Sequence, residues 1–241
     1  MKTEVILSPL LYKGRILQEH HTTVAVDVLR ATTAICAAFQ SGAEEVLPLD
    51  SVDDLATYRA LGYTVAAERE GKKLPYASLG NSPTEYLKLQ LQGQKLAFST
   101  TNGTVAILLG HEAERLYVGA FANLDSLAQR LTAEGRDVVV LCSGWKGEPC
   151  LEDTLFAGAL VERLSAVSIS SSMEMVNDAA AMAVALWRLA KTDLYGYCSK
   201  ATHVKRLQRL NYDCDVRLAL QLNTCNVVPM MDGATRTLRL S

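Results

Sequence analysis

Short apolar runs alternate with longer amphipathic segments through the first two thirds of the chain. The runs are rich in Val, Leu, Ile and Ala, which is typical of strands in a sheet that is covered on both faces. They occupy residues 4–7, 24–28, 45–49, 63–67, 95–99, 115–118 and 137–141. Helices are predicted between them at residues 32–40, 52–61, 103–109 and 123–134. Strands that alternate with helices predict an α/β protein with a mainly parallel or mixed sheet and helices on both faces.

The pattern becomes mostly helical after Gly144. Residues 152–164, 173–189 and 199–210 favour helix, and residues 226–229 form a last strand-like run. We therefore predict an α/β sheet domain over residues 1–165, which carries most of the candidate site. The mostly helical residues 166–241 either pack on that sheet or form a small cap. The Ser-rich residues 168–172 are the expected flexible connection.

The composition excludes several classes of function. Lys and Arg number 24 against 26 Asp and Glu, which gives a formal net charge of −2, and no long basic run suggests a nucleic-acid binder. The basic residues at 203–209 read as the solvated side of a helix. The longest apolar stretch, near residues 179–186, is too short to cross a bilayer, and no signal peptide is recognised, so we predict a cytoplasmic protein. The six cysteines show no metal-site spacing and are expected to be free thiols.

Residues 24–33, with the sequence VAVDVLRATT, combine an acid, a base and two hydroxyls at the end of a predicted buried strand. A carboxylate such as Asp27 is costly there unless a cation, a metal or hydrogen bonds compensate its charge. Arg30 could be that partner or could serve a ligand. Thr32 or Thr33 could cap the next helix and leave its first N–H groups facing an anion. The alternative is a purely structural pair of Asp27 and Arg30 with a helix cap.

Polar side chains also follow other predicted strands, and the carboxyl ends of parallel strands collect at one edge of a sheet. Thr101, Asn102 and Gly103 could turn sharply around an anion, although Asn-Gly is also a common turn. Lys146, between two glycines, suits a phosphate or sulfonate oxygen.

Three acids, Glu148, Glu152 and Asp153, follow Lys146 and could hold a divalent cation or could simply favour a helix N-terminus. Asn81 offers a polar side chain before Ser82 and Pro83, which have the pattern of a helix start.

Two other catalytic schemes fit less well. Cys142 could be a nucleophile, but the four histidines (His20, His21, His111 and His203) lie outside the clustered segments. Asp27 could be an aspartyl-phosphate nucleophile, but Leu29 stands where haloacid dehalogenase-like phosphatases usually have a second acid.

Five segments together resemble the 2-phosphosulfolactate phosphatase family of coenzyme M biosynthesis. Their order and spacing agree over about residues 24–160, and the C-terminal region resembles the family chiefly at residues 226–229, NVVP. The segments are VAVDVLRATT at 24–33, LGNSP at 79–83, TTNGT at 100–104, GAFAN at 119–123 and SGxxGExxLEDxxxAGA at 143–159.

The resemblance implies a Mg²⁺-dependent phosphatase that hydrolyses 2-phospho-3-sulfolactate to 3-sulfolactate and phosphate. It also implies a three-layer α/β/α fold, a homodimer and a small anionic substrate that carries phosphate with sulfonate or carboxylate. The implied catalytic residues are Asp27, Arg30, Glu148 and Asp153. The implied metal ligands are Asp27, Glu148, Glu152 and Asp153. With Thr32 and Gly103 added from the strand-end pattern, the substrate-binding residues are Thr32, Asn81, Thr101, Asn102, Gly103, Asn123 and Lys146.

We hypothesise that Mg²⁺, held by Asp27 with Glu148 or Asp153, polarises the phosphoryl group while water attacks in line. Covalent attack by Asp27 is the alternative route. A phosphatase for another small phosphorylated hydroxy acid, or a binding protein that senses a small polyanion, would use the same basic groups.

Overall fold

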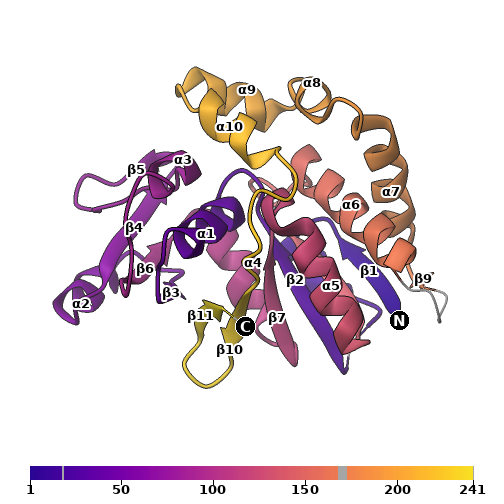
Figure 1. The fold of residues 1–241 in the computed structure, drawn as a ribbon, viewed down its shortest axis with the longest axis horizontal. Helices are drawn as coiled ribbons and strands as arrows, with labels where there is room; N and C mark the ends of the chain where they lie inside the picture. Colours follow the sequence, from indigo (N-terminus) through magenta and orange to yellow (C-terminus); the bar gives the residue numbers. More distant parts are fainter. Residues whose placement is uncertain (18, 168–172, 241) are drawn as a thin grey trace.

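Eleven strands form one mixed sheet in the computed structural model, which describes residues 1–17, 19–167 and 173–240 (Figure 1). The predicted connection at residues 168–172 lies outside the described residues. The strands are β1 (Lys2–Ile6), β2 (His21–Val26), β3 (Glu45–Pro48), β4 (Thr64–Arg69), β5 (Lys72–Lys73), β6 (Lys95–Ser99), β7 (Arg115–Gly119), β8 (Asp137–Cys142), β9 (Glu174–Met175), β10 (Pro229–Asp232) and β11 (Thr237–Leu240). Their order in the sheet is β5-β4-β6-β3-β11-β10-β7-β2-β8-β1-β9.

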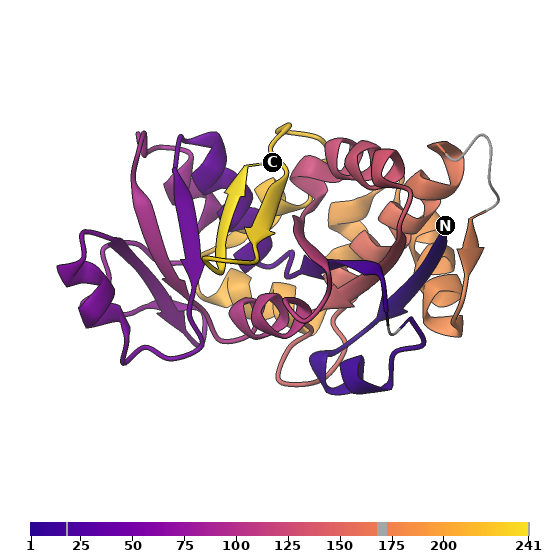
Figure 2. The same cartoon turned by 90° about the horizontal axis from the view of Figure 1, so that it is seen from below.

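The sheet consists of two parallel halves joined by a hairpin. Strands β7, β2, β8 and β1 pair in parallel in one half, and β3, β6 and β4 in the other. The hairpin of β10 and β11 lies between them and is antiparallel to β7 on one side and to β3 on the other. Figure 2 shows this yellow hairpin between the purple strands and the strands of the other half. The strand predicted at residues 226–229 is shifted toward the C-terminus, because β10 begins only at Pro229, where the hairpin starts.

Helices cover both faces of the sheet, which confirms the predicted α/β/α layers. They are η1 (Pro9–Gly14), α1 (Ala31–Gln40), α2 (Leu55–Ala60), α3 (Pro83–Tyr86), α4 (Gly103–Gly110), η2 (Phe121–Asn123), α5 (Leu124–Glu134), α6 (Leu151–Val167), α7 (Asp178–Ala190), α8 (Leu194–Cys198), α9 (Thr202–Arg209) and α10 (Asp213–Ala219). Val138 and Val140 of β8 join a core with α5, α6 and α7, whereas Val139 and Leu141 face η1 and α4. This alternation along one strand gives the sheet its two covered faces.

The helix predicted at residues 173–189 begins later than expected. Residues 174 and 175 form the edge strand β9, and α7 starts only at Asp178. The side chain of Asn177 sets this start, since its oxygen accepts a hydrogen bond from the backbone N–H of Ala180 at 3.1 Å. Helices α8, α9 and α10 follow and lie along the top of the molecule in Figure 1.

Two further expectations concern the whole chain. In the described part of the chain, no helix is long and apolar enough to cross a membrane. All six cysteines lie in that part and are free thiols, as predicted.

Candidate active site

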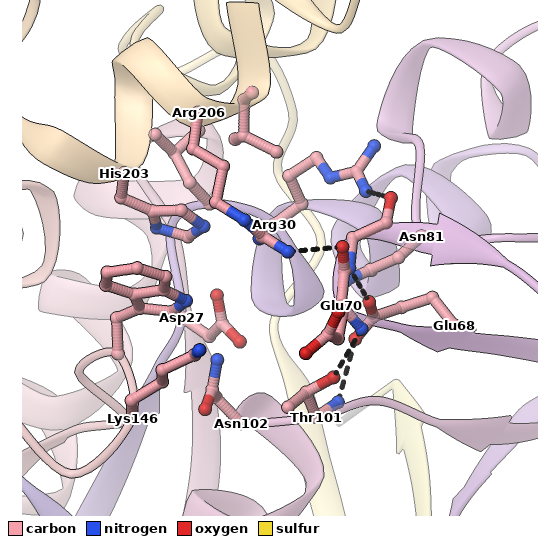
Figure 3. Close-up of a pocket in the computed structure, with 14 residues that line it drawn as sticks. Asp27, Arg30, Glu68, Glu70, Asn81, Thr101, Asn102, Lys146, His203 and Arg206 are labelled. Carbon is pink, nitrogen blue, oxygen red and sulfur yellow. Dashed lines mark hydrogen bonds between the residues drawn. The ribbon is translucent and has the colours of Figure 1, made fainter. Parts of the chain in front are cut away.

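A cavity lies where β2, β4, β6 and β8 end, and helix α9 borders it (Figure 3). Its volume is about 480 Å³ when its open mouth is included. The lining residues are Asp27, Leu29, Arg30, Glu68, Glu70, Gly71, Asn81, Thr101, Asn102, Trp145, Lys146, His203, Arg206 and Leu207. Six of them were candidates in the sequence, namely Asp27, Arg30, Asn81, Thr101, Asn102 and Lys146. The expected gathering of polar groups at the strand ends is thus present.

Asp27 is a buried carboxylate at the end of β2, with 6% of its surface exposed. Burial raises its pKa to about 6, against an ordinary value of 3.8; the charge of His203 opposes this rise, and that of Glu68 adds to it. The N-terminus of α4 approaches Asp27 closely, because Gly103 has no side chain. A Cβ atom at Gly103 would lie 2.6 Å from Oδ2 of Asp27. Gly103 itself is buried and is not among the residues that line the cavity.

Thr32 holds the turn between β2 and α1 and does not line the cavity. Its hydroxyl donates to the backbone oxygen of Asp27 at 2.8 Å and accepts from the N–H of the same residue at 3.1 Å. Thr33 donates to the backbone oxygen of Val28 at 2.8 Å in the same manner. These bonds fix the backbone that presents Asp27.

Arg30 takes Asp215, rather than Asp27, as its carboxylate partner. The Nη1 to Oδ2 distance is 2.8 Å, and both side chains are almost completely buried. Nη2 donates to the backbone oxygen of Gly71 at 2.7 Å, and the guanidinium stacks 4.0 Å from the ring centroid of Tyr212. Arg30 thus connects the β2 turn to α10 and to the β4–β5 turn. It still lines the cavity and contributes positive charge there.

Glu68 organises the loops opposite Asp27 and was not among the sequence candidates. Its Oε1 accepts from the backbone N–H of Thr101 at 2.7 Å, and its Oε2 accepts from that of Gly71 at 2.5 Å. The hydroxyl of Thr101 accepts from the backbone N–H of Glu70 at 3.2 Å. The acids after β4 were visible in the sequence as a strand-end cluster, but their contacts with residues 100–103 depend on the pairing of β4 with β6.

Asn81 presents an unsatisfied acceptor. The residue is 6% exposed, and its Oδ1 has no hydrogen-bond partner among the residues that the structure describes. An unpaired buried oxygen costs free energy unless a ligand or ion satisfies it. Asn81 is therefore placed to bind a donor or a cation in the cavity.

Asp153 supports the backbone of the site. Its Oδ1 accepts from the N–H of Val28 at 2.9 Å, and its Oδ2 accepts from Gly144 and Ser143 at 3.1 and 3.3 Å. Burial raises its pKa well above the ordinary value, and the neighbouring charge of Asp27 adds to that rise. Asp153 thus joins the loop after β8 to the turn after β2.

The remaining predicted metal ligands lie outside the cavity lining. Glu152 is fully buried and pairs with His203, whereas Glu148 is exposed and borders a neighbouring pocket. Of the four predicted ligands, Asp27 alone lines the cavity. Within residues 1–17, 19–167 and 173–240, no group of three or more His, Cys, Asp or Glu side chains is placed to hold a metal.

Helix α9 supplies two residues that were predicted to lie on the solvated side of a helix. His203 is buried, and its Nδ1 lies 2.7 Å from Oε1 of Glu152. Its ring stacks on Trp145, with 5.8 Å between centroids and 11° between planes. Arg206, one helical turn later, donates to the backbone oxygen of Glu70. The sequence showed only that His203 and Arg206, three residues apart, share one face of a helix. That this face lines the cavity follows from the path of the chain over the strand ends.

Asn123 lies in the protein interior away from the cavity. Its Oδ1 accepts from the N–H of Ala120 at 3.0 Å, and its Nδ2 donates to the backbone oxygens of Val118 and Val227 at 3.1 and 3.0 Å. These bonds attach the segment before β10 to the end of β7.

Comparisons with known proteins agree with the resemblance drawn from five segments and extend it through the C-terminal region. The family model of 2-phosphosulpholactate phosphatase matches residues 8–234. A protein of Synechococcus sp. (strain CC9605) is 40% identical over 212 residues, which cover 86% of this chain and 87% of that protein. One from a strain of Prochlorococcus marinus is 38% identical over 214 residues, with 86% and 88% covered. Both are named probable 2-phosphosulfolactate phosphatase. The chain belongs to the 2-phosphosulfolactate phosphatase family.

Proposed function

We propose that this protein is a phosphoric monoester hydrolase that converts 2-phospho-3-sulfolactate to 3-sulfolactate and phosphate. The observation that carries the proposal is a small cavity at the strand ends in which basic side chains face the buried carboxylates of Asp27 and Glu68. Family membership supports the same reaction.

The charge of the cavity suits a small polyanion. Arg30 is compensated by Asp215, but no described carboxylate lies within salt-bridge distance of Lys146 or Arg206. A substrate with a phosphate and a second acidic group can pair with these two cations. In this proposal, Arg30 and the backbone at Gly103 contact the phosphoryl oxygens beside Asp27, and Lys146 and Arg206 bind the rest of the substrate.

Mg²⁺ is the proposed cofactor. The cavity offers oxygen donors that suit it: the carboxylate of Asp27, the unpartnered Oδ1 of Asn81 and the exposed carboxylate of Glu70. Mg²⁺ commonly keeps several waters and takes one or two carboxylates together with substrate phosphate, so this donor set is sufficient. When bound, the ion would polarise the phosphoryl group and neutralise its charge.

Two routes remain for the attack on phosphorus, by water or by Asp27 itself. A phosphoenzyme that forms in the wild-type protein and is absent in Asp27→Asn would assign the attack to Asp27. Its absence during wild-type turnover supports attack by water.

The first experiment measures phosphate release from racemic 2-phospho-3-sulfolactate, with Mg²⁺ and with EDTA. Phospholactate and phosphoglycolate are the control substrates. We expect metal-dependent release that favours the sulfonated substrate. Release from the controls alone would overturn the substrate assignment, whereas binding of all three compounds with no turnover would identify a sensor of small anions.

A homodimer is also proposed. Light scattering after size exclusion would then give about twice the chain mass of 26.2 kDa. A mass equal to that of one chain would contradict the proposal.

A further inference from the structure

We propose that His203 protonates the leaving oxygen of the phosphate ester, and that Glu152 positions its ring for this step. The inference rests on the proposed phosphatase function and assigns a residue to a part of the reaction for which the sequence offered no candidate. Two contacts of His203 and its place in the cavity carry the argument.

The contact with Glu152 determines which ring nitrogen faces the substrate. Nδ1 of His203 lies 2.7 Å from Oε1 of Glu152, so Nδ1 donates its proton there and Nε2 is the nitrogen left for the cavity. Glu152 is fully buried, and its Oε2 has no partner among the described residues. Because Nδ1 is occupied by Glu152, Nε2 is the only ring nitrogen from which His203 can pass a proton to a group in the cavity.

The contact with Trp145 fixes the plane of the ring. The indole and imidazole lie nearly parallel, at 11°, and both side chains line the cavity. Figure 3 shows His203 on the wall that α9 supplies, across the cavity from Glu68 and Asn81. A ring that is held from one edge by Glu152 and along one face by Trp145 loses little freedom when it acts.

The reaction needs such a proton, because the alcohol that leaves is a poor leaving group. When the ester P–O bond breaks, its electron pair goes to the alcohol oxygen, which takes the proton from Nε2 of His203. On the route by water, the oxygen of the attacking water forms the new P–O bond. The proton that this water loses passes to solvent, and His203 regains one from solvent in the same turnover.

The other cationic groups of the described cavity lining are less suited to this step. Arg30 and Arg206 do not release protons near neutral pH. Lys146 is exposed at the mouth, where water solvates its ammonium group.

Leaving-group dependence tests the proposal. We compare His203→Gln with the wild type on 2-phospho-3-sulfolactate, which releases an alcohol, and on acetyl phosphate, which releases acetate and needs no proton. We expect kcat to fall about 100- to 1000-fold for the first substrate and less than about 5-fold for the second. Glu152→Gln should show the same pattern with a smaller loss. His111→Gln, which changes a histidine outside the cavity, is the matched control.

Equal losses on both substrates would overturn the proposal and leave His203 with a structural role, as would an unchanged kcat for the alcohol ester. If a variant does not fold, kcat of the wild type is measured on a series of aryl phosphates whose leaving groups differ in pKa. A shallow dependence of kcat on the leaving-group pKa supports a proton donor, and a steep dependence overturns the proposal. Failure of the wild type to cleave 2-phospho-3-sulfolactate would refute the proposed substrate instead. The same comparison would then use whichever control alcohol ester it hydrolyses.

Discussion

Among single residues, Asp27 has the largest electrostatic cost in the cavity. Its carboxyl group lies at the end of a central strand with the acids Glu68 and Glu152 nearby, and its pKa is raised to about 6. Proteins commonly keep such unfavourable charges where function needs them, at the expense of stability. The consequence for stability has a definite sign and depends on pH.

We predict that Asp27→Asn stabilises the fold above pH 6. A carboxyl group with a raised pKa binds its proton more tightly in the folded state, so its ionisation destabilises the fold fully above about pH 6 and not at all below its unfolded pKa of about 3.8. Urea unfolding at pH 8 should show a gain of up to about 3 kcal/mol, which shrinks as the pH falls from 6 to 4. A gain that does not change with pH would contradict this origin. The exposed acid in Asp54→Asn is the control.

Gly103 is predicted to tolerate no larger side chain. The added Cβ of Gly103→Ala would meet Oδ2 of Asp27 at 2.6 Å and Cβ of Ala31 even more closely, so α4 must move away from α1 and from the carboxylate of Asp27. We expect a loss of about 1–3 kcal/mol in unfolding free energy and a large fall in kcat. In Gly233→Ala, the new Cβ would meet nothing within 4 Å, and both quantities should stay near wild type. Normal turnover in Gly103→Ala would show that this close approach is not needed.

Single residues also show what sequence can tell about the site. Asp27, Thr101 and Lys146 were found because they follow predicted strands whose carboxyl ends must meet. Asn123 and Asp153 have the same polar character at strand ends, yet they bind backbone groups in the interior. Residue type and position do not separate a group that faces a ligand from one that satisfies buried N–H or C=O groups.

Among the elements, α10 is attached by a buried ion pair as well as by its apolar side chains Val216 and Ala219. Asp215 of α10 accepts from Arg30 at 2.8 Å and, through its other oxygen, from the hydroxyls of Ser82 and Thr84 at 2.7 and 2.6 Å. The three donors come from the β2 turn and the start of α3. The short helix is therefore fixed by polar contacts to segments far away in sequence.

Asp215→Ala is expected to cost about 3–5 kcal/mol of unfolding free energy, because it leaves the charge of Arg30 buried without its partner. Chemical denaturation measures the change. Asp213→Ala, on the same helix, removes a half-buried carboxylate that accepts from Arg217, Tyr195 and Gln208, and should cost less, about 1–2 kcal/mol. Similar losses in the two variants would mean that α10 is held by its apolar contacts.

The elements differ in how well the sequence predicted them. Strand β6 has the predicted bounds, and α1 and α4 differ by one residue from expectation, because their apolar runs are continuous in the sequence. Helices were predicted in the C-terminal region, but the side of α9 that carries His203 and Arg206 was wrongly predicted to face solvent. The strongly amphipathic pattern of α9 shows which side of the helix is buried. It does not show that His203 and Arg206 border a cavity formed by strands that lie about 60 to 180 residues earlier in the chain.

At the scale of the whole molecule, the β10–β11 hairpin joins the parallel strands β7, β2, β8 and β1 to the parallel strands β3, β6 and β4. Leu238 of β11 is fully buried beside Val46 of β3, and Met230 of β10 pairs with Tyr117 of β7. Neither half pairs directly with the other in the strand order. Residues 229–240 therefore give the protein one continuous sheet.

We predict that Leu238→Ala loosens both halves together. Removal of this buried side chain should cost about 2–5 kcal/mol, and amide hydrogen exchange should accelerate in β3 and β7 alike. Leu240, two residues later on the same strand, is 51% exposed, and Leu240→Ala should change little. Faster exchange in β3 alone would show that the halves are stable independently.

The position of this hairpin has a consequence for synthesis on the ribosome. Translation delivers both parallel halves before residues 229–240, so the nascent chain holds two open sheet edges, at β3 and β7, until the last strands emerge. During that interval, either edge can pair with a neighbouring chain. The arrangement makes the growing polypeptide most vulnerable to aggregation shortly before its central strands arrive.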